Sequence, residues 1–385
     1  MRIPFNDLAT PHASIVEDVV AEVRALAGNS RFIGGPAVEA FEQDFAAYCR
    51  TTHAVGVANG TDAIELTLRA LGIGGGDEVL VPANTFIATA SAVAATGATP
   101  VFVDVDPVSL LVTPASLEAG VTERTAAVIP VHLYGHMVPP GDVLPFAAKH
   151  GLAVIEDSAQ AHGANAPAPQ SAQDGTPGEK VRAGSYGVAG TFSFYPGKNL
   201  GAWGDGGAVV TDDAQLASRI RSLANHGRSE GTDHYEHRYI GRNSRLDALQ
   251  ATVLRRKLAD LDTATGQRRR VASVYTEALA AHGIPMVAPL PGVDSAWHLL
   301  VARVQGRESA REFVRRQLDE AGIGTGVHYP VPCHRQHAYA TDQTVSLPAA
   351  EQAATEIVSL PFFPHLRDEE VAYVADHLAK AITAL

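Results

Sequence analysis

The chain is short of cysteine, of positive charge and of long apolar runs, and each shortage excludes a class of protein. Its two cysteines, Cys49 and Cys333, cannot build a disulfide framework, so we expect a reducing compartment. Lys and Arg number 30 against 42 Asp and Glu, and no basic stripe offsets the net charge of −12, so nucleic acid is not an expected partner. No run reaches ~18 apolar residues and residues 1–7 carry no apolar signal core, so we expect a cytoplasmic protein without a membrane partner.

What remains is an ordinary globular composition, with 46% hydrophobic and 19% charged residues. Short apolar runs at 78–81, 100–105, 127–131 and 152–155 have the length and flanking residues of strands. They alternate with helical spacing at 62–70, where Thr61 is a plausible cap, and at 87–95 and 143–150. This alternation predicts an α/β fold with a mostly parallel sheet covered by helices, and ligands at the carboxyl ends of its strands.

The last third of the chain has a different pattern of expected helices and strands. A helical pattern covers 245–279 with a break near Asp262-Thr263, then a strand is expected at 299–304 and helices at 310–320 and 368–385. We therefore expect a large domain at 13–258 and a smaller α/β domain at 259–385, with residues 1–12 packing on the smaller one. Residues 165–178 are rich in Ala, Pro, Gln and Gly without a period, and we expect a surface loop there.

Several glycine and histidine patterns fail in their context. The glycines at 72–76 follow a helix and precede a strand, whereas a dinucleotide-binding loop needs the reverse order. Gly197-Lys198-Asn199 has no Ser or Thr after the lysine, so it is not a phosphate-binding P-loop. His132 and His136 lie in or just after an expected strand, where residues four apart share a face only loosely. The pairs at 234/237 and 334/337 lack acidic or thiol partners in a ligand pattern, so we expect no metal site.

Two segments before residue 190 place polar groups where a ligand would bind. Asn59-Gly60-Thr61-Asp62 opens a helix, whose free N–H groups favour an anion; a plain helix cap is the alternative. Asp157, in Glu156-Asp157-Ser158-Ala159-Gln160, follows a buried strand, where an isolated carboxylate is costly. A protonated ring nitrogen would be a suitable partner, although capping of the next element or an arginine would serve too.

The third segment surrounds a lysine with glycines at the end of an apolar strand, in Thr191-Phe192-Ser193-Phe194-Tyr195-Pro196-Gly197-Lys198. A lysine in a tight, partly desolvated place has a lowered pKa, as a Schiff-base amine requires. A surface lysine in a loop is the alternative for this residue taken alone.

These three segments, in this order and spacing, resemble the DegT/DnrJ/StrS family of sugar aminotransferases, which have the type I fold of enzymes that use pyridoxal 5'-phosphate (PLP). The resemblance covers nearly the whole chain, and the Asp157 and Lys198 motifs are specific in combination. It extends through the segments at 4–8, 32–36, 84–86, 242–247 and 360–364.

The resemblance implies a role for each matching residue. Lys198 would form the Schiff base and move the proton, and Asp157 would pair with the pyridinium nitrogen. Gln160 would contact the ring hydroxyl and Phe86 the ring face. The phosphate would be held by Gly60, Thr61, Asp62 and Ser193, and by Asn243 of the neighbouring subunit. His328 and Tyr329 would line the sugar pocket. The active unit would be a homodimer with shared sites.

The expected reaction is transfer of an amino group from L-glutamate to a nucleotide-linked keto-sugar. A dTDP-linked keto-6-deoxyhexose is the favoured acceptor, and the residues around Lys198 favour C3 over C4. A PLP-dependent sugar dehydratase, which carries histidine in place of this lysine in some relatives, is one alternative. A non-catalytic regulatory protein of the same fold and an NAD-dependent oxidoreductase are the others.

Overall fold

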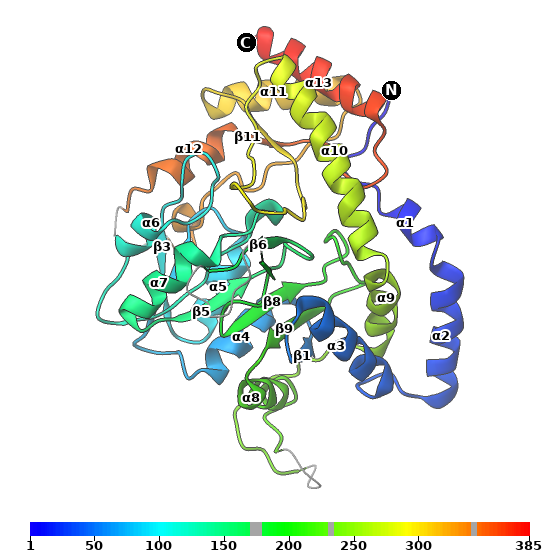
Figure 1. Ribbon diagram of the computed structural model, residues 1–385, viewed down its shortest axis with the longest axis vertical. Helices are drawn as coiled ribbons and strands as arrows, with labels where there is room; N and C mark the ends of the chain where they lie inside the picture. The colour runs from blue at the N-terminus through cyan, green and yellow to red at the C-terminus, as the bar shows by residue number, and fades with distance from the viewer. Residues whose placement is uncertain (170–178, 230–234, 340–344) are drawn as a thin grey trace.

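A seven-stranded sheet forms the centre of the computed structural model, which describes residues 1–169, 179–229, 235–339 and 345–385 (Figure 1). The strand order is β1-β9-β8-β5-β4-β2-β3. Strand β9 runs antiparallel to both of its neighbours, and the other pairs are parallel. The mostly parallel sheet expected from the sequence is thus confirmed. The strands are β1 (His53–Val57), β2 (Glu78–Pro82), β3 (Thr99–Val103), β4 (Thr125–Val128), β5 (Ala153–Asp157), β8 (Ala189–Ser193) and β9 (Gly207–Thr211).

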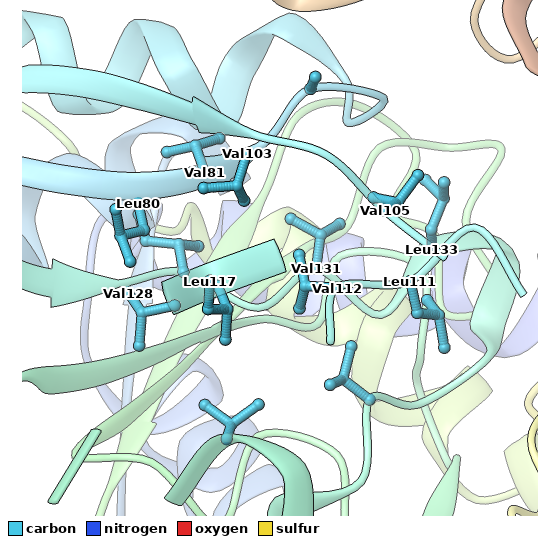
Figure 2. Packing of buried hydrophobic residues seen from close by; sticks show 14 of the residues in the cluster. Leu80, Val81, Val103, Val105, Leu111, Val112, Leu117, Val128, Val131 and Leu133 are labelled. Atoms are coloured by element: carbon cyan, nitrogen blue, oxygen red, sulfur yellow. The ribbon is translucent and has the colours of Figure 1, made fainter. Parts of the chain in front are cut away.

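Helices cover the sheet, which explains why most strand residues are apolar. Every residue of β2 and of β9 is buried. Figure 2 shows Leu80, Val103 and Val128 of the strands packed near Leu117 of a covering helix, within the largest core cluster of the described residues. The helices associated with the sheet are α2 (Val16–Asn29), α3 (Pro36–Cys49), α4 (Gly60–Ala70), α5 (Ile87–Ala95), α6 (Pro114–Glu118), α7 (Pro140–His150), α8 (Ala214–Ala224) and α9 (Ala248–Leu258).

A second core cluster lies at the end of the molecule that carries both termini (Figure 1). It includes Ile3 from the start of the chain and residues of α10, α11 and α13. Helix α10 joins the two regions, because Leu261 packs in a cluster beside the sheet and Val271 packs in this second one. The domain boundary at 258/259 stays a prediction. The longer elements after α9 are α10 (Leu261–Ala281), β10 (Val301–Arg303), α11 (Glu308–Glu320), α12 (Pro348–Glu356), β11 (Ile357–Ser359) and α13 (Asp368–Thr383).

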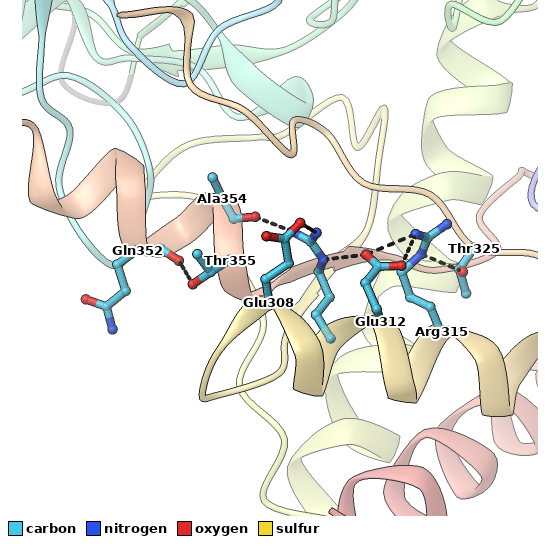
Figure 3. A network of polar contacts seen from close by, with 8 residues as sticks. Glu308, Glu312, Arg315, Thr325, Gln352, Ala354 and Thr355 are labelled. Carbon is cyan, nitrogen blue, oxygen red and sulfur yellow. Dashed lines mark hydrogen bonds and ion pairs between the residues drawn. The ribbon is translucent and has the colours of Figure 1, made fainter. Parts of the chain in front are cut away.

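A buried arginine ties α11 to α12. The side chain of Arg311 is 1% exposed, and it pairs with Glu308 at 3.0 Å and Glu312 at 2.9 Å while donating to the carbonyl oxygen of Ala354. Figure 3 shows Glu312 also contacting Arg315, which reaches Thr325. Each charge in this network has a partner, as burial of an arginine requires.

The sequence misplaced several local boundaries. Asn59, not Thr61, caps α4, because its side chain accepts the N–H of Asp62 at 2.8 Å. The long helical pattern breaks at 259–260, between α9 and α10. Residues 165–167 form β6 (Asn165–Pro167), which pairs with β7 (Lys180–Arg182), so the expected loop begins as a strand. Residues 170–178 lie outside the described part of the chain. Short elements complete the fold: α1 (Ala9–Ala13), η1 (Leu133–Gly135) and η2 (Cys333–Arg335).

Within the described ranges, no helix is long and apolar enough to cross a membrane. The same residues contain no group of three or more His, Cys, Asp or Glu side chains placed to hold a metal ion.

Candidate active site

A cavity of about 960 Å³ opens at the carboxyl ends of β5 and β8. Asp157 ends β5, Ser193 ends β8, and the N-terminus of α4 faces the same space. The cavity brings together every residue expected from the sequence except Asn243, which is exposed and pairs with Asn225 elsewhere. The expected residues that line it are Gly60, Thr61, Asp62, Phe86, Asp157, Gln160, Ser193, Lys198, His328 and Tyr329.

Lys198 brings an unpaired amine into this cavity. The described residues give its ammonium group no hydrogen bond and no ion pair. Burial is the main cause that lowers the pKa of Lys198 to about 8, and the nearby negative charge of Asp157 partly opposes this shift. An amine with such a pKa is neutral in a large fraction of molecules near pH 8, and a neutral amine is the nucleophilic form.

Asp157 is held by a short chain of hydroxyl groups. Thr89 Oγ1 donates to Asp157 Oδ2 at 2.8 Å, and the N–H of Ala159 donates to Oδ1 at 3.2 Å. The single proton of the Thr89 hydroxyl is thereby used, so Thr85 must donate to Thr89 across their 2.8 Å contact. The carboxylate is 7% exposed, and each of its oxygens keeps a lone pair for a further donor in the cavity.

The start of α4 forms a cradle for an anion. Gly60 packs so closely on the end of β8 that an added Cβ would lie 2.7 Å from Ser193 Cβ. The N–H of Asp62 is used by the Asn59 cap, so Gly60 and Thr61 contribute the free N–H groups of this helix start. Free N–H groups, the helix dipole and two hydroxyl side chains suit a phosphate.

Tyr134 connects the two sides of the cavity. Its N–H donates to Gln160 Oε1 at 2.6 Å, and its hydroxyl donates to the carbonyl oxygen of His328 at 2.5 Å. The first bond fixes the orientation of the Gln160 amide, whose Nε2 then donates to the hydroxyl of Tyr329 at 3.0 Å. Gln160 and Tyr329 therefore present a defined pair of polar groups to the cavity.

Aromatic rings form the cavity mouth. Phe86 is 52% exposed, and its ring centroid lies 5.4 Å from that of Tyr329. Phe5, from the start of the chain, stacks on His328 with centroids 5.6 Å apart. Burial and the positive charge of Lys198 lower the pKa of His328 to about 4, so this histidine is neutral at physiological pH.

Sequence reasoning missed the residues that hold the expected ones in place. Thr89 had a detectable signal, because it lies one helical turn after Thr85 at the start of the helix predicted over 87–95. Tyr134 and His298 carry no local motif, since their contacts reach residues more than 25 positions away. Phe5 and Asn6 line the cavity although the sequence assigned no site role to either of them.

These residues fit PLP. Its phosphate matches the anion cradle at the start of α4, and its protonated ring nitrogen can donate to a free lone pair of Asp157. Its aldehyde requires a neutral amine such as that of Lys198. Phe86 offers an exposed ring face at the same mouth.

Fold and site together define a PLP-dependent aminotransferase. The profile of the DegT/DnrJ/EryC1/StrS aminotransferase family matches residues 13–379. The chain belongs to this family.

Individual relatives agree over their whole lengths. The chain is 45% identical over 378 residues to the dTDP-3-amino-3,4,6-trideoxy-alpha-D-glucose transaminase of Streptomyces venezuelae, covering 97% of this chain and 95% of the relative. It is 46% identical to the erythromycin biosynthesis sensory transduction protein EryC1 of Saccharopolyspora erythraea, over all of both chains. The crystal structure of S. venezuelae DesV in complex with a ketimine intermediate superposes with a TM-score of 0.90 at 43% identity, covering 99% of this chain and 98% of that one.

Proposed function

We propose that this enzyme transfers an amino group from L-glutamate to a dTDP-linked keto-6-deoxyhexose, at C3 in preference to C4. The observation that carries the proposal is the unpaired amine of Lys198 facing Asp157 inside one cavity. The relatives support the substrate class, since three of them are named as transaminases of dTDP-linked 3-amino sugars.

Each residue of the site has a proposed task. PLP, when bound, supplies an electron sink for negative charge beside the reacting nitrogen. Lys198 would hold the cofactor as a Schiff base. After the amino donor displaces it, its free amine would act as the acid/base that moves the proton in the 1,3-shift. Asp157 keeps the ring nitrogen protonated, and Gln160 donates its fixed Nε2–H to the ring hydroxyl. Phosphate contacts are proposed for Gly60, Thr61 and Ser193; Asp62, expected from the sequence to join them, lies beside them with its N–H bound to Asn59. A ring contact is proposed for Phe86 and sugar contacts for His328 and Tyr329.

The size of the cavity supports a substrate much larger than an amino acid. A volume of about 960 Å³ is at the upper end of small-molecule sites, whose usual range is roughly 300–1,000 Å³. A cofactor alone would leave much of this space open. The exposed mouth, with Phe5, Phe86 and Tyr329, offers aromatic surface on which a sugar or a base can pack.

The charge of the cavity supports a homodimer with shared sites. Among the described residues that line it, Lys198 is the one cation, against Asp62, Asp157 and Asp205. A cofactor phosphate and a nucleotide diphosphate need more donors than this single chain supplies. We propose that a second copy contributes Asn243, which lies exposed and away from its own chain's cavity.

A mixed dimer tests the shared site. A dimer with Asn243→Ala in one copy and Lys198→Ala in the other should regain one working site of its two, whereas the Lys198→Ala homodimer should be inactive and the Asn243→Ala homodimer weak. Activity of the mixed dimer no greater than that of the Lys198→Ala homodimer would contradict the sharing. A cytoplasmic location is part of the same proposal, in keeping with two cysteines that are both free.

The alternatives make different predictions for one measurement. The absorption spectrum of the purified protein is recorded with PLP, then with L-glutamate, and the keto-sugar product is analysed by mass spectrometry and NMR. A visible PLP band that bleaches with L-glutamate, followed by an amino-sugar product, supports the proposal. A deoxygenated product without nitrogen would indicate the dehydratase, and a band that no amino donor changes would favour the regulatory protein.

A further inference from the structure

His298 lies in the wall of the same cavity as Lys198, but neither the sequence nor the proposed roles give it a task. It precedes β10, and its N–H donates to the carbonyl oxygen of Tyr134 at 2.8 Å. Tyr134 is also the residue that fixes the Gln160 amide. Tyr134 therefore holds both the backbone of His298 and the side chain of Gln160.

The tautomer of His298 is fixed by the residue next to the lysine. Asn199 Nδ2 donates to the carbonyl oxygen of Ala296 at 2.8 Å, and an amide nitrogen is the end that can pair with a carbonyl. Asn199 Oδ1 therefore faces His298, 3.2 Å from its Nδ1, and must accept a hydrogen bond from an Nδ1–H group. With the proton on Nδ1, a neutral ring has an unprotonated Nε2.

The surroundings of His298 keep the ring neutral. Burial is the largest cause that holds its pKa well below the ordinary value. The charged and titratable groups around it act in the same direction, because they are basic: Lys198, Arg268, His328 and His162. Burial also lowers the pKa of His162, to about 3. The two neighbouring histidines, His162 and His328, are therefore both neutral at physiological pH.

We propose that His298 is a positioning residue whose unprotonated Nε2 accepts a hydrogen bond from an amine N–H in the cavity. Two amines are available, that of Lys198 and that of the incoming amino donor, and the chemistry of the contact is the same for both. The acceptor orients the nitrogen lone pair toward the reacting carbon, because an N–H held by His298 points away from it. This role rests on the proposed function of Lys198.

The tautomer can be measured without turnover. In protein labelled with ¹⁵N-histidine, with His298→Gln used to assign the signal, the ring should have a protonated Nδ1 and an unprotonated Nε2 from pH 6 to pH 9. A ring protonated on Nε2, or on both nitrogens, in that range would overturn the proposal. This experiment stands even if Lys198 proves not to hold the cofactor.

Paired variants test the acceptor itself. His298→Gln can place an amide oxygen near the position of Nε2 and should keep most of the rate of the half-reaction with the amino donor. His298→Phe removes the acceptor and should lower that rate roughly 3- to 10-fold, as loss of a hydrogen bond between neutral groups does. The control is His136→Gln, a buried neutral histidine outside the cavity, which should leave the rate per folded enzyme unchanged.

Asn199→Asp supplies a readout that a packing role would not move. A carboxylate against Nδ1–H favours the imidazolium, so the pKa of His298 rises and Nε2 becomes a donor at low pH. The variant should lose activity below this raised pKa and recover it as pH increases, with a matching change in the ¹⁵N spectrum. A loss that is the same at every pH would overturn the proposal.

The two amines are distinguished in His298→Phe. If Lys198 is the donor, the pH at which the absorption band of bound PLP titrates will shift while the KM for the amino donor stays constant. If the substrate amine is the donor, the KM will rise roughly 3- to 10-fold and the titration will not move. No change in either quantity would overturn the role. Separately, failure of borohydride to attach the cofactor to Lys198 would refute the proposed function rather than this inference.

Discussion

Glu156 and Asp157 are neighbours at the end of β5, yet their carboxylates meet opposite environments. Glu156 is fully buried and accepts four hydrogen bonds, from the N–H groups of Gly184, Tyr186 and Gly187 and from His132 Nε2, at 2.7 to 2.9 Å. Asp157 accepts two within the described chain and faces the cavity. Alternation along the strand sends the two side chains to opposite faces of the sheet.

The difference separates a structural carboxylate from a functional one. All four lone-pair positions of Glu156 are taken by the protein, so it organises the 184–187 turn that leads into β8. His132 is fixed as well, since its Nδ1 accepts the N–H of Val138 at 3.1 Å. Asp157 keeps free lone pairs that face the cavity, and this is why we propose it, and not Glu156, as the carboxylate that binds a ligand.

The largest expected effect follows from removing the amine opposite Asp157. Lys198→Ala should abolish turnover and the visible band of bound PLP, because no other described lysine lines the cavity. Band and activity are measured on the same preparation, and circular dichroism checks the fold. Turnover above background in the folded variant would show that the cavity side of β5 does not carry the chemistry.

Asp157→Asn removes the charge on the cavity side with little change in shape. We expect turnover to fall roughly 10²- to 10³-fold, since breaking a buried ion pair costs roughly 3–5 kcal/mol. Thermal stability should change little, because the amide can still accept from Thr89. A rate within a factor of three of the unmodified enzyme would remove the distinction between the two carboxylates.

Glu156→Gln is the matched change on the other face. Its amide NH₂ would meet two donors in place of an acceptor, so we expect a loss of roughly 2–5 kcal/mol in the free energy of unfolding. Activity per folded molecule should remain close to normal. Urea denaturation measures the first quantity, and active-site titration with PLP normalises the second.

The smallest effect should come from Thr89. Thr89→Val deletes the donor to Asp157 Oδ2 and should lower turnover roughly 3- to 10-fold, in keeping with a hydrogen bond worth roughly 0.5–1.5 kcal/mol. Thr89→Ser keeps the hydroxyl and should restore the rate. Equal losses in both variants would indicate packing of the threonine methyl group instead.

The sequence was sufficient for the large features and insufficient for the supporting contacts. The parallel sheet followed from apolar runs, and Asp157 and Lys198 followed from motifs next to strands. The choice between Asn59 and Thr61 as the cap of α4 depends on backbone angles, and both residue types are good caps. Glu156 and Asp157 are equally acidic in sequence, and which one is satisfied internally depends on a turn 28 to 31 residues later.

The contacts of His298 illustrate the same limit. Asn199 is adjacent to the predicted lysine, but its partner is 99 residues away, and nothing in either local segment indicates that they meet. Contacts of this kind depend on how the segment before β10 folds back over the sheet.

Tyr134 has a consequence for how this enzyme can change its substrate over evolution. Its backbone and hydroxyl join Gln160, His298 and the His328 carbonyl, so a shift of the 328–329 segment is transmitted to the groups around the cofactor. If this segment contacts the acceptor, as we propose, substitutions in it that alter substrate choice should also lower the catalytic rate. Asn6 lines the same cavity and, within the described part of the chain, has no hydrogen bond to Tyr134 or its partners, so it is a position where side chains can change without disturbing this network.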